Sequence, residues 1–340
     1  MYKPKFRISP GILKLIIEAT ELKTWIEQAS VDVVWLHRLQ LESIARIAHS
    51  STSIEGNSLT FSQVKALAQG SEISAIEKDK IEIGNYFRAL QWVWKLKKSF
   101  PIKEPQIFRL HHILTQDLLS LDQVGKYKKK QNRIVNEKGF TVYTPPPPNE
   151  TPKRVAELLL WLKSSEAKEL HAIVVSAIVH HQLVSIHPFS DGNGRISRLL
   201  GLWILYERGF DTKHLFTLDE FFNENRQTYY LKIQQARDLD DDLTYWIEYV
   251  AEGVVSTLKK VKERVHSLKI SQKNIKISLT QRQEDFLIFL RDHGRVKSTD
   301  FEKEFKMTRS RVNQIIRPLV EQGLVFQEGY TRATTYILAS

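Results

Sequence analysis

The sequence contains no cysteine in its 340 residues. It therefore forms no disulfide and no zinc site with thiolate ligands, and it suits a reducing compartment. Long apolar runs are also missing: residues 172–179 are among the longest, contain Ser176, and are far too short to span a bilayer. The basic N-terminus leads into an amphipathic, charged stretch at 11–28, which lacks the pattern of a signal peptide. We therefore expect a cytoplasmic protein.

The remaining composition is typical of a folded protein. Apolar residues make up 42% and charged residues 26%, and a length of 340 residues suggests two or three domains with a sizeable core. The formal net charge of +11 favours acidic partners, nucleic acid among them, although a basic surface often serves solubility alone. Charge by itself does not decide between these two interpretations.

The most informative stretch is His-Pro-Phe-Ser-Asp-Gly-Asn-Gly-Arg-Ile-Ser-Arg, at residues 187–198. Apolar residues repeat at helical spacing before it, over 170–184, and after it, over 196–204. We therefore predict a tight polar loop between two helices. The pattern of the second helix places Arg195 and Arg198 away from its apolar face, so both side chains are predicted to point out of the core.

The glycines and arginines of this loop suit a polyphosphate. Gly192 and Gly194 allow a ligand to approach the backbone closely, because they have no side chain. Their N–H groups open a helix N-terminus, which favours anions. Arg195 and Arg198 lie one turn apart on that helix and can together grip phosphate oxygens.

Two further side chains supply chemistry that a nucleotide reaction needs. Asp191 is a hard oxygen ligand for the Mg²⁺ that accompanies a nucleotide, and His187 is the natural proton acceptor. A plain helix–loop–helix turn would explain the glycines, but not these residues together with Asn193 and the arginines. Adjacent histidines at 111–112 and 180–181 predict no metal site, because neighbours on a helix face different directions.

Residues 187–198 resemble the Fic family signature, HxFx[D/E]GNGRxxR, at every specified position. The resemblance implies a helical fold and transfer of a nucleoside monophosphate, usually AMP from ATP, to a protein hydroxyl. It implies that His187 is the catalytic base and Asp191 the Mg²⁺ ligand. The family often has an aromatic pair near the adenine, here Tyr229 and Tyr230, although packing on a core helix explains them equally well. The implied phosphate-binding residues are Gly192, Asn193, Gly194, Arg195 and Arg198.

An earlier stretch, Ser51-x-x-x-Glu55-Gly56, is similar to the inhibitory motif of Fic proteins, [S/T]xxxE[G/N]. On a helix Ser51 and Glu55 share one face, and a carboxylate near a helix C-terminus benefits from an outside cation. The family implies that this cation is the second signature arginine, Arg198, which then could not hold the γ-phosphate of ATP. We therefore expect auto-inhibition by Glu55. The alternative is that residues 55–57 form an exposed turn.

Two short β-type runs, at 133–135 and 140–143, flank a turn and predict a β-hairpin. In Fic proteins a hairpin flap at this position holds the target segment by strand addition. Helical spacing predicts the other elements up to residue 254. These predicted helices cover 35–48, a segment from Phe61 onward, 82–96, 105–119, 151–162, 221–233 and 239–254.

Residues 259–276 are charged and predict a helix tail and linker. Beyond them, three helical segments and a hairpin resemble a winged helix-turn-helix. Its third helix would offer Arg309, Arg311 and Asn313 to DNA, with Arg332 in the wing. Winged helices also bind proteins, and acidic residues dilute the charge of this one. DNA and a protein therefore stand as equal alternatives for its partner.

The sequence thus predicts a mainly α protein. Its predicted parts are an N-terminal helical region (1–100) with the inhibitory motif, a Fic catalytic core with a hairpin flap (101–258), the charged linker (259–276) and the winged helix-turn-helix (277–340). The predicted activity is protein adenylyltransfer from ATP, with Mg²⁺, to a Ser, Thr or Tyr hydroxyl. The alternatives are a DNA-binding regulator with a nucleotide-sensing core, and a Fic enzyme that uses another nucleotide or removes AMP. Fic proteins often self-associate, so a homodimer is a further expectation.

Overall fold

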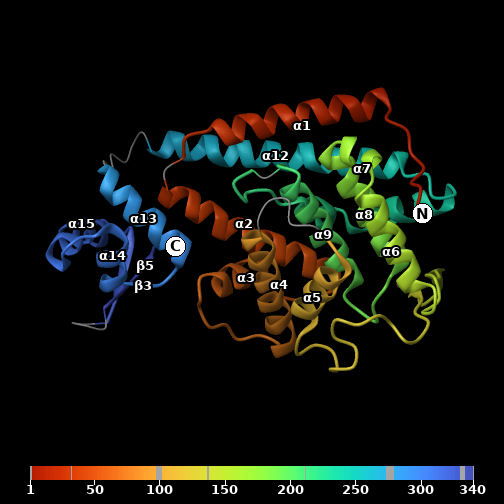
Figure 1. The fold of residues 1–340 in the computed structure, drawn as a ribbon, viewed down its shortest axis with the longest axis horizontal. Coiled ribbons are helices and arrows are strands. Elements are labelled where there is room, and N and C mark those ends of the chain that lie inside the picture. The colour runs from red at the N-terminus through yellow and green to blue at the C-terminus, as the bar shows by residue number, and fades with distance from the viewer. Residues whose placement is uncertain are drawn as a thin grey trace. The chain divides into compact units, whose positions relative to one another are not determined.

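The computed structural model describes residues 2–31, 33–96, 102–135, 138–210, 212–272, 279–329 and 334–339 (Figure 1). The described chain is mainly helical with short strands, so the predicted fold class is confirmed. It divides into two compact units, Met1–Glu27 with Ser43–Lys262, and Gln28–Glu42 with Glu263–Ser340. In these ranges no helix has both the length and the apolar character needed to cross a bilayer.

The N-terminal helices are α1 (Pro10–Gln28), α2 (Val33–Ile54), α3 (Phe61–Ala68) and α4 (Glu77–Lys95). Local signals explain where they begin and end. Thr60 caps α3 because its side chain accepts the Gln63 N–H while the Gln63 side chain accepts the Thr60 N–H. Gly56, with a φ of 98°, takes the left-handed conformation that ends α2. The predicted inhibitory motif therefore covers the last turn of one helix and the residue that stops it.

Next come α5 (Glu104–Thr115), the strands β1 (Ile134–Val135) and β2 (Thr141–Tyr143), and then α6 (Thr151–Leu162) and α7 (Ser165–Glu169). The two strands pair antiparallel, with Ile134 opposite Tyr143, so the predicted hairpin is confirmed. Part of the predicted turn, at residues 136–137, lies outside the described residues. Val135, Phe140 and Val142 are exposed, so the hairpin presents apolar side chains to solvent.

The centre of the larger unit is the pair α8 (Ala172–Ile186) and α9 (Asn193–Glu207), the most extensively packed pair of described helices (Figure 1). Nearly every residue of α8 is buried, which explains why its apolar pattern is almost continuous. The two helices approach closely at Gly201, whose carbonyl accepts a hydrogen bond from Ser176 Oγ at 2.8 Å. The predicted helix–loop–helix is confirmed, and its loop lies between two buried helices.

Next come α10 (Leu218–Glu224), α11 (Arg226–Asp238) and α12 (Thr244–Gln272), of which the residues up to Lys262 belong to the larger unit. The single helical stretch predicted at 221–233 is wrong, because the chain breaks at Asn225. There the backbone turns to a φ of −137° and the Asn225 side chain accepts the Thr228 N–H at 3.0 Å. Asparagine favours such a cap because its side chain replaces a missing helical hydrogen bond. Helix α12 includes most of the predicted charged segment, whose last residues, 273–276, lie outside the described ranges.

The smaller unit contains α13 (Gln281–His293), β3 (Val296–Lys297), α14 (Ser298–Phe305), α15 (Arg309–Glu321), β4 (Val325–Glu328) and β5 (Thr335–Leu338). The strands form an antiparallel sheet in the order β3-β5-β4. The helices enclose a core that includes Phe286, Phe301 and Leu319. The three helices and the hairpin match the predicted elements, and only β3 was missed. Arg332 lies outside the described residues, and the winged-helix assignment stays a prediction.

Candidate active site

His187 follows α8 directly and has a left-handed backbone with a φ of 51°. Its Nδ1 lies 3.1 Å from the carbonyl oxygen of Val184, so Nδ1 carries the hydrogen and donates it. Nε2 is then the acceptor, and it has no hydrogen-bond partner among the described residues. Desolvation by burial lowers the pKa of His187 to about 4, so the ring is neutral at pH 7. A neutral imidazole with a free Nε2 can accept a proton.

Asn193 closes the loop between the two central helices. Its Oδ1 accepts the Phe189 N–H at 2.9 Å and its Nδ2 donates to the Phe189 carbonyl at 2.9 Å. Both functional atoms are thus used by the loop backbone, so the side chain shapes the loop. Gly192 has a φ of 77°, and a Cβ there would lie 3.0 Å from Thr115 Cγ2. A side chain at Gly192 would therefore meet both backbone strain and crowding.

His111, which sequence reasoning did not place in the site, supports the loop from α5. Its ring stacks on that of Phe189, with centroids 3.8 Å apart and planes 7° apart. Nδ1 accepts the Gly125 N–H at 2.9 Å, so Nε2 carries the hydrogen and donates to the Asp191 carbonyl at 3.0 Å. Burial lowers the pKa of His111 to about 4, which keeps this tautomer neutral. A local sequence pattern could not predict this role of His111, because Asp191 lies 80 residues further along the chain.

Arg198 of α9 is buried, with a side-chain exposure of 1%. Its Nη2 donates to Glu55 Oε1 at 2.7 Å and to the Ser51 carbonyl at 2.7 Å, and its Nε donates to Ser51 Oγ at 2.8 Å. Asp219, also buried, lies 3.3 Å from Nε. The end of α2 therefore brings both motif residues onto this guanidinium, and α10 adds a second carboxylate.

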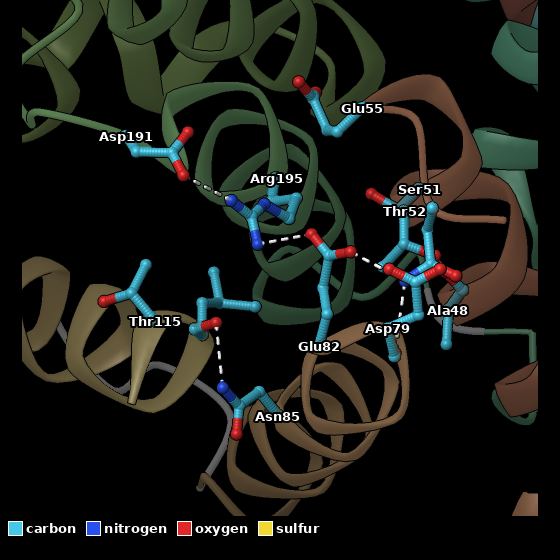
Figure 2. A network of polar contacts seen from close by, with 12 residues as sticks. Ala48, Ser51, Thr52, Glu55, Asp79, Glu82, Asn85, Thr115, Asp191 and Arg195 are labelled. Atoms are coloured by element: carbon cyan, nitrogen blue, oxygen red, sulfur yellow. Dashed lines mark hydrogen bonds and ion pairs between the residues drawn. The ribbon is translucent and has the colours of Figure 1, made fainter. Parts of the chain in front are cut away.

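Arg195 is the other arginine of α9, and 6% of its side chain is exposed. Figure 2 shows it between two carboxylates: Nη1 lies 2.5 Å from Glu82 Oε1 of α4, and Nη2 lies 3.2 Å from Asp191 Oδ2. The prediction that Arg195 and Arg198 point out of the core is thus wrong. The helical pattern located the apolar face of α9 correctly, but it carries no information about the acidic residues that cover the polar face.

Glu55 lies directly over the start of α9. A Cβ built on Gly194 would lie 2.1 Å from Glu55 Oε1, so only a glycine leaves room for this carboxylate. About a third of the Glu55 side chain is exposed. The carboxylate therefore lies beside the first turn of α9, where backbone N–H groups have no helical partners and favour an anion.

The two tyrosines of α11 have different surroundings. Tyr229 is buried and its Oη lies 2.9 Å from His180 Nε2, while Arg198 Nη1 is 3.5 Å away. Tyr230 is 45% exposed, and its hydroxyl donates to the carbonyl of Ile54, the last residue of α2, at 3.1 Å. Tyr229 is thus a packing residue that also lines the arginine site, and Tyr230 contacts the end of the motif helix.

Asp191 is the residue best placed to hold a metal ion. Its side chain is 63% exposed, and one oxygen is paired with Arg195. In the described ranges no group of three or more His, Cys, Asp or Glu side chains gathers at a possible metal position. One carboxylate fits Mg²⁺ because this ion usually binds one or two protein carboxylates together with substrate phosphates and water.

The candidate nucleic-acid contacts belong to the smaller unit. Arg309, Arg311 and Asn313 are exposed on α15, while Val312 and Ile316 of the same helix are buried. The structure therefore separates a polar face from an apolar face on this helix, as the sequence pattern indicates.

A mainly helical core thus holds the signature loop between two buried helices. Residues 101–205 match the family model described as Fic/DOC family, in agreement with the predicted resemblance. It is 29% identical over 215 residues to protein adenylyltransferase Fic of Nematostella vectensis, covering 62% of this chain and 47% of the relative. Against the protein of the same name from Aedes aegypti, identity is 25% over 228 residues, or 66% of this chain and 42% of the relative. The chain thus spans less than half the length of these relatives.

Solved structures show the same fold. A Fic family protein from Desulfovibrio desulfuricans superposes with a TM-score of 0.70 at 24% identity, covering 99% of this chain and 98% of that one. Fic-1 of C. elegans gives a TM-score of 0.63 at 23% identity, covering 76% and 73%. The predicted family resemblance is therefore confirmed at the level of domain and fold.

Proposed function

We propose that this chain is a protein adenylyltransferase, which transfers AMP from ATP to a Ser, Thr or Tyr hydroxyl of a protein target. The observation that carries the proposal is the loop geometry: a neutral His187 with Nε2 available stands next to a helix N-terminus bearing Arg195 and Arg198. The two relatives, each named protein adenylyltransferase Fic, support the same reaction class.

In the proposed reaction the triphosphate of ATP binds at the start of α9, against the N–H groups of residues 192–194 and the two arginines. The target hydroxyl oxygen attacks the α-phosphorus while His187 Nε2 accepts its proton. The bond from the α-phosphorus to the bridging oxygen breaks, and its electron pair leaves with pyrophosphate. Asp191 would hold Mg²⁺, which would neutralise phosphate charge. Most of the rate would come from positioning and charge stabilisation.

The resting protein is proposed to be inhibited by Glu55. Its carboxylate is paired with Arg198 and lies over Gly194, where phosphate oxygens would bind. ATP that enters this form would lose one arginine as a partner for its γ-phosphate, and the α-phosphate would be held in an unproductive orientation. Displacement of Glu55 would restore the productive geometry.

A second candidate is removal of AMP from a modified target. The position of Glu55 favours AMP removal, because its carboxylate is partly exposed beside the loop and could orient an attacking water. Use of another nucleotide is the remaining variant. Hydrolysis of a pre-modified target and competition between nucleotides would separate these activities from AMP transfer.

For the smaller unit we propose a binding role through α15. Its exposed polar side chains precede the first acidic residue of the helix, Glu321. They include Arg309, Arg311, Asn313 and Gln314. A sequence-specific DNA site and a protein surface both suit such a face. A regulator that binds DNA and uses the core only to sense nucleotide is therefore the second functional class to test.

The deciding experiment is label transfer from ATP labelled at the α-phosphate, with Mg²⁺, with and without cell lysate. We expect strong labelling of protein by Glu55→Gly, weak labelling by the wild type, and none by Glu55→Gly/His187→Ala. ATP labelled at the γ-phosphate is the matched control and should transfer nothing. Normal labelling without His187, or transfer of the γ-phosphate, would contradict adenylyl transfer through this loop.

A further inference from the structure

Glu82 of α4 links the signature loop to the turn that follows the inhibitory helix. Its side chain is 11% exposed, and each carboxylate oxygen has a different partner. Oε1 lies 2.5 Å from Arg195 Nη1, while Oε2 accepts a hydrogen bond from Asn57 Nδ2 at 2.7 Å. One buried carboxylate therefore contacts a phosphate-binding arginine and a residue only two positions beyond Glu55.

Asn57 stabilises the turn that follows α2 through several hydrogen bonds. Its Nδ2 also donates to the Asp79 carbonyl at 3.1 Å, and its Oδ1 accepts the Leu59 N–H at 3.1 Å. Its own N–H donates to the carbonyl of Thr52 in the last turn of α2, at 3.1 Å. Both bonds of Nδ2 therefore reach α4, while Oδ1 and the backbone N–H fix the turn that follows α2.

Two further hydrogen bonds hold the chain near this turn. Ser58 N–H donates to Asp79 Oδ2 at 3.0 Å, and the Tyr230 hydroxyl of α11 donates to the Ile54 carbonyl at 3.1 Å. These two contacts hold the chain on either side of Glu55, but neither reaches an arginine of the loop. Glu82 alone among these groups contacts both the turn and Arg195.

We infer that Glu82 is a positioning residue with two separable roles: it orients Arg195 for the polyphosphate, and through Asn57 it keeps Glu55 over the site. The inference rests on the proposed function. The first role follows because a guanidinium fixed by a buried carboxylate keeps one orientation before the ligand arrives. The second follows because Glu55 cannot leave Arg198 by a shift of this turn unless the bond between Asn57 and Glu82 breaks.

The two roles predict opposite effects on transfer: loss of the inhibitory role raises it and loss of the positioning role lowers it. Testing each variant both with Glu55 present and in the Glu55→Gly background separates the two effects. Asn57→Asp retains an oxygen for the Leu59 N–H, but it removes the Nδ2 bonds to Glu82 and to the Asp79 carbonyl and places two carboxylates in repulsion. We expect it to raise transfer about tenfold when Glu55 is present, the size expected from loss of one hydrogen bond to a charged group. It should change nothing in the Glu55→Gly background, where inhibition is already absent.

Glu82→Gln should behave differently. In the Glu55→Gly background we expect it to lower kcat about tenfold, with a smaller change in the KM for ATP, because Arg195 is no longer held for the transition state. Glu82→Asp should recover part of this loss. Glu77→Gln is the matched control, because Glu77 lies on the same helix, pairs with Lys80 and is 73% exposed on its side chain. It should change neither activity nor inhibition.

Hydrogen exchange of residues 52–59 supplies a readout that does not require transfer. Asn57→Asp should speed exchange in this segment about tenfold while the control leaves it unchanged. If Glu55→Gly labels nothing but exchange responds as expected, the proposed activity fails and the link between Glu82 and the turn stands. Unchanged exchange in Asn57→Asp overturns the inhibitory role, and an equal kcat for Glu82→Gln and its parent overturns the positioning role.

Discussion

The arginines of α9 and α15 look alike in the sequence but differ in the structure. In both helices they lie away from the apolar face, yet Arg198 is 1% exposed between Glu55 and Asp219, whereas Arg311 is exposed. A helical pattern therefore identifies the apolar face of a helix and leaves open what covers its polar face. A covered arginine must exchange one anionic partner for another before it can bind phosphate, while an exposed arginine can attract an anion at longer range.

The largest expected difference between the two helices is in stability. Arg198→Ala should lower the free energy of unfolding by about 3–5 kcal/mol, because buried Asp219 loses its cation. Arg311→Ala should change it by less than about 0.5 kcal/mol, as is usual for an exposed side chain. Urea unfolding followed by tryptophan fluorescence measures both. Equal small effects would mean that the buried cluster of Arg198 adds no net stability.

A pH titration tests burial in the larger unit. Burial lowers the pKa of His111, His181 and His187 to about 4, from 6.5. Below pH 6.5 these histidines take up protons in the unfolded chain but not in the folded chain. Their full contribution to the free energy of unfolding is therefore present above pH 6.5, and it is lost as the pH falls toward 4. We expect a loss of roughly 1–2 kcal/mol per histidine at pH 5. Stability that stays level from pH 7 to pH 5 would contradict this.

His111→Phe tests whether α5 supports the loop. Phenylalanine keeps a ring to stack on Phe189 but leaves the Asp191 carbonyl and the Gly125 N–H without their partner. We expect a loss of about 1–3 kcal/mol in stability and a comparable increase in the barrier to transfer in the Glu55→Gly background. His112→Phe, the neighbouring position, is the control. If His111→Phe left transfer unchanged, Asn193 alone would be sufficient to hold the loop, and the supporting role of α5 would be contradicted.

The smallest expected effect concerns α15. If the smaller unit binds DNA, Arg311→Ala should weaken binding modestly and reduce the slope of log affinity against log salt by about one. Asn313→Ala should relax base preference without changing that slope, because an uncharged side chain releases no counterion. Electrophoretic mobility shift at several salt concentrations distinguishes the two. Absence of DNA binding at low salt would favour a protein partner.

The signature loop could be predicted from the sequence because its chemistry is concentrated in residues 187–198, where glycines and polar groups follow one another directly. The contact of Ser51 and Glu55 with Arg198 could be predicted only through the family resemblance, since nothing local in the sequence links these residues. His111 and Glu82 were missed because their partners lie far along the chain and meet only when helices pack. Local periodicity contains no information about such meetings.

The sequence pattern also failed to predict features that are shorter than its period or that depend on a single side chain. The two-residue strand β3 is shorter than any periodic signal, and the break at Asn225 depends on a single capping side chain inside a helical pattern. The long central helices, in contrast, were predicted because their apolar residues recur over several turns. Periodicity therefore recovered the scaffold, while the contacts that position its charged groups required the packed structure.

Glu55 belongs to the same chain as the arginine that it contacts, at a separation of 143 residues. Its effective concentration at Arg198 is therefore set by the geometry of the fold and does not change with the amount of protein. Dilution cannot separate the pair, whereas an anion that belonged to another molecule would dissociate from Arg198. Release of Glu55 therefore requires either a competing anion at Arg198 or a force that moves the end of α2.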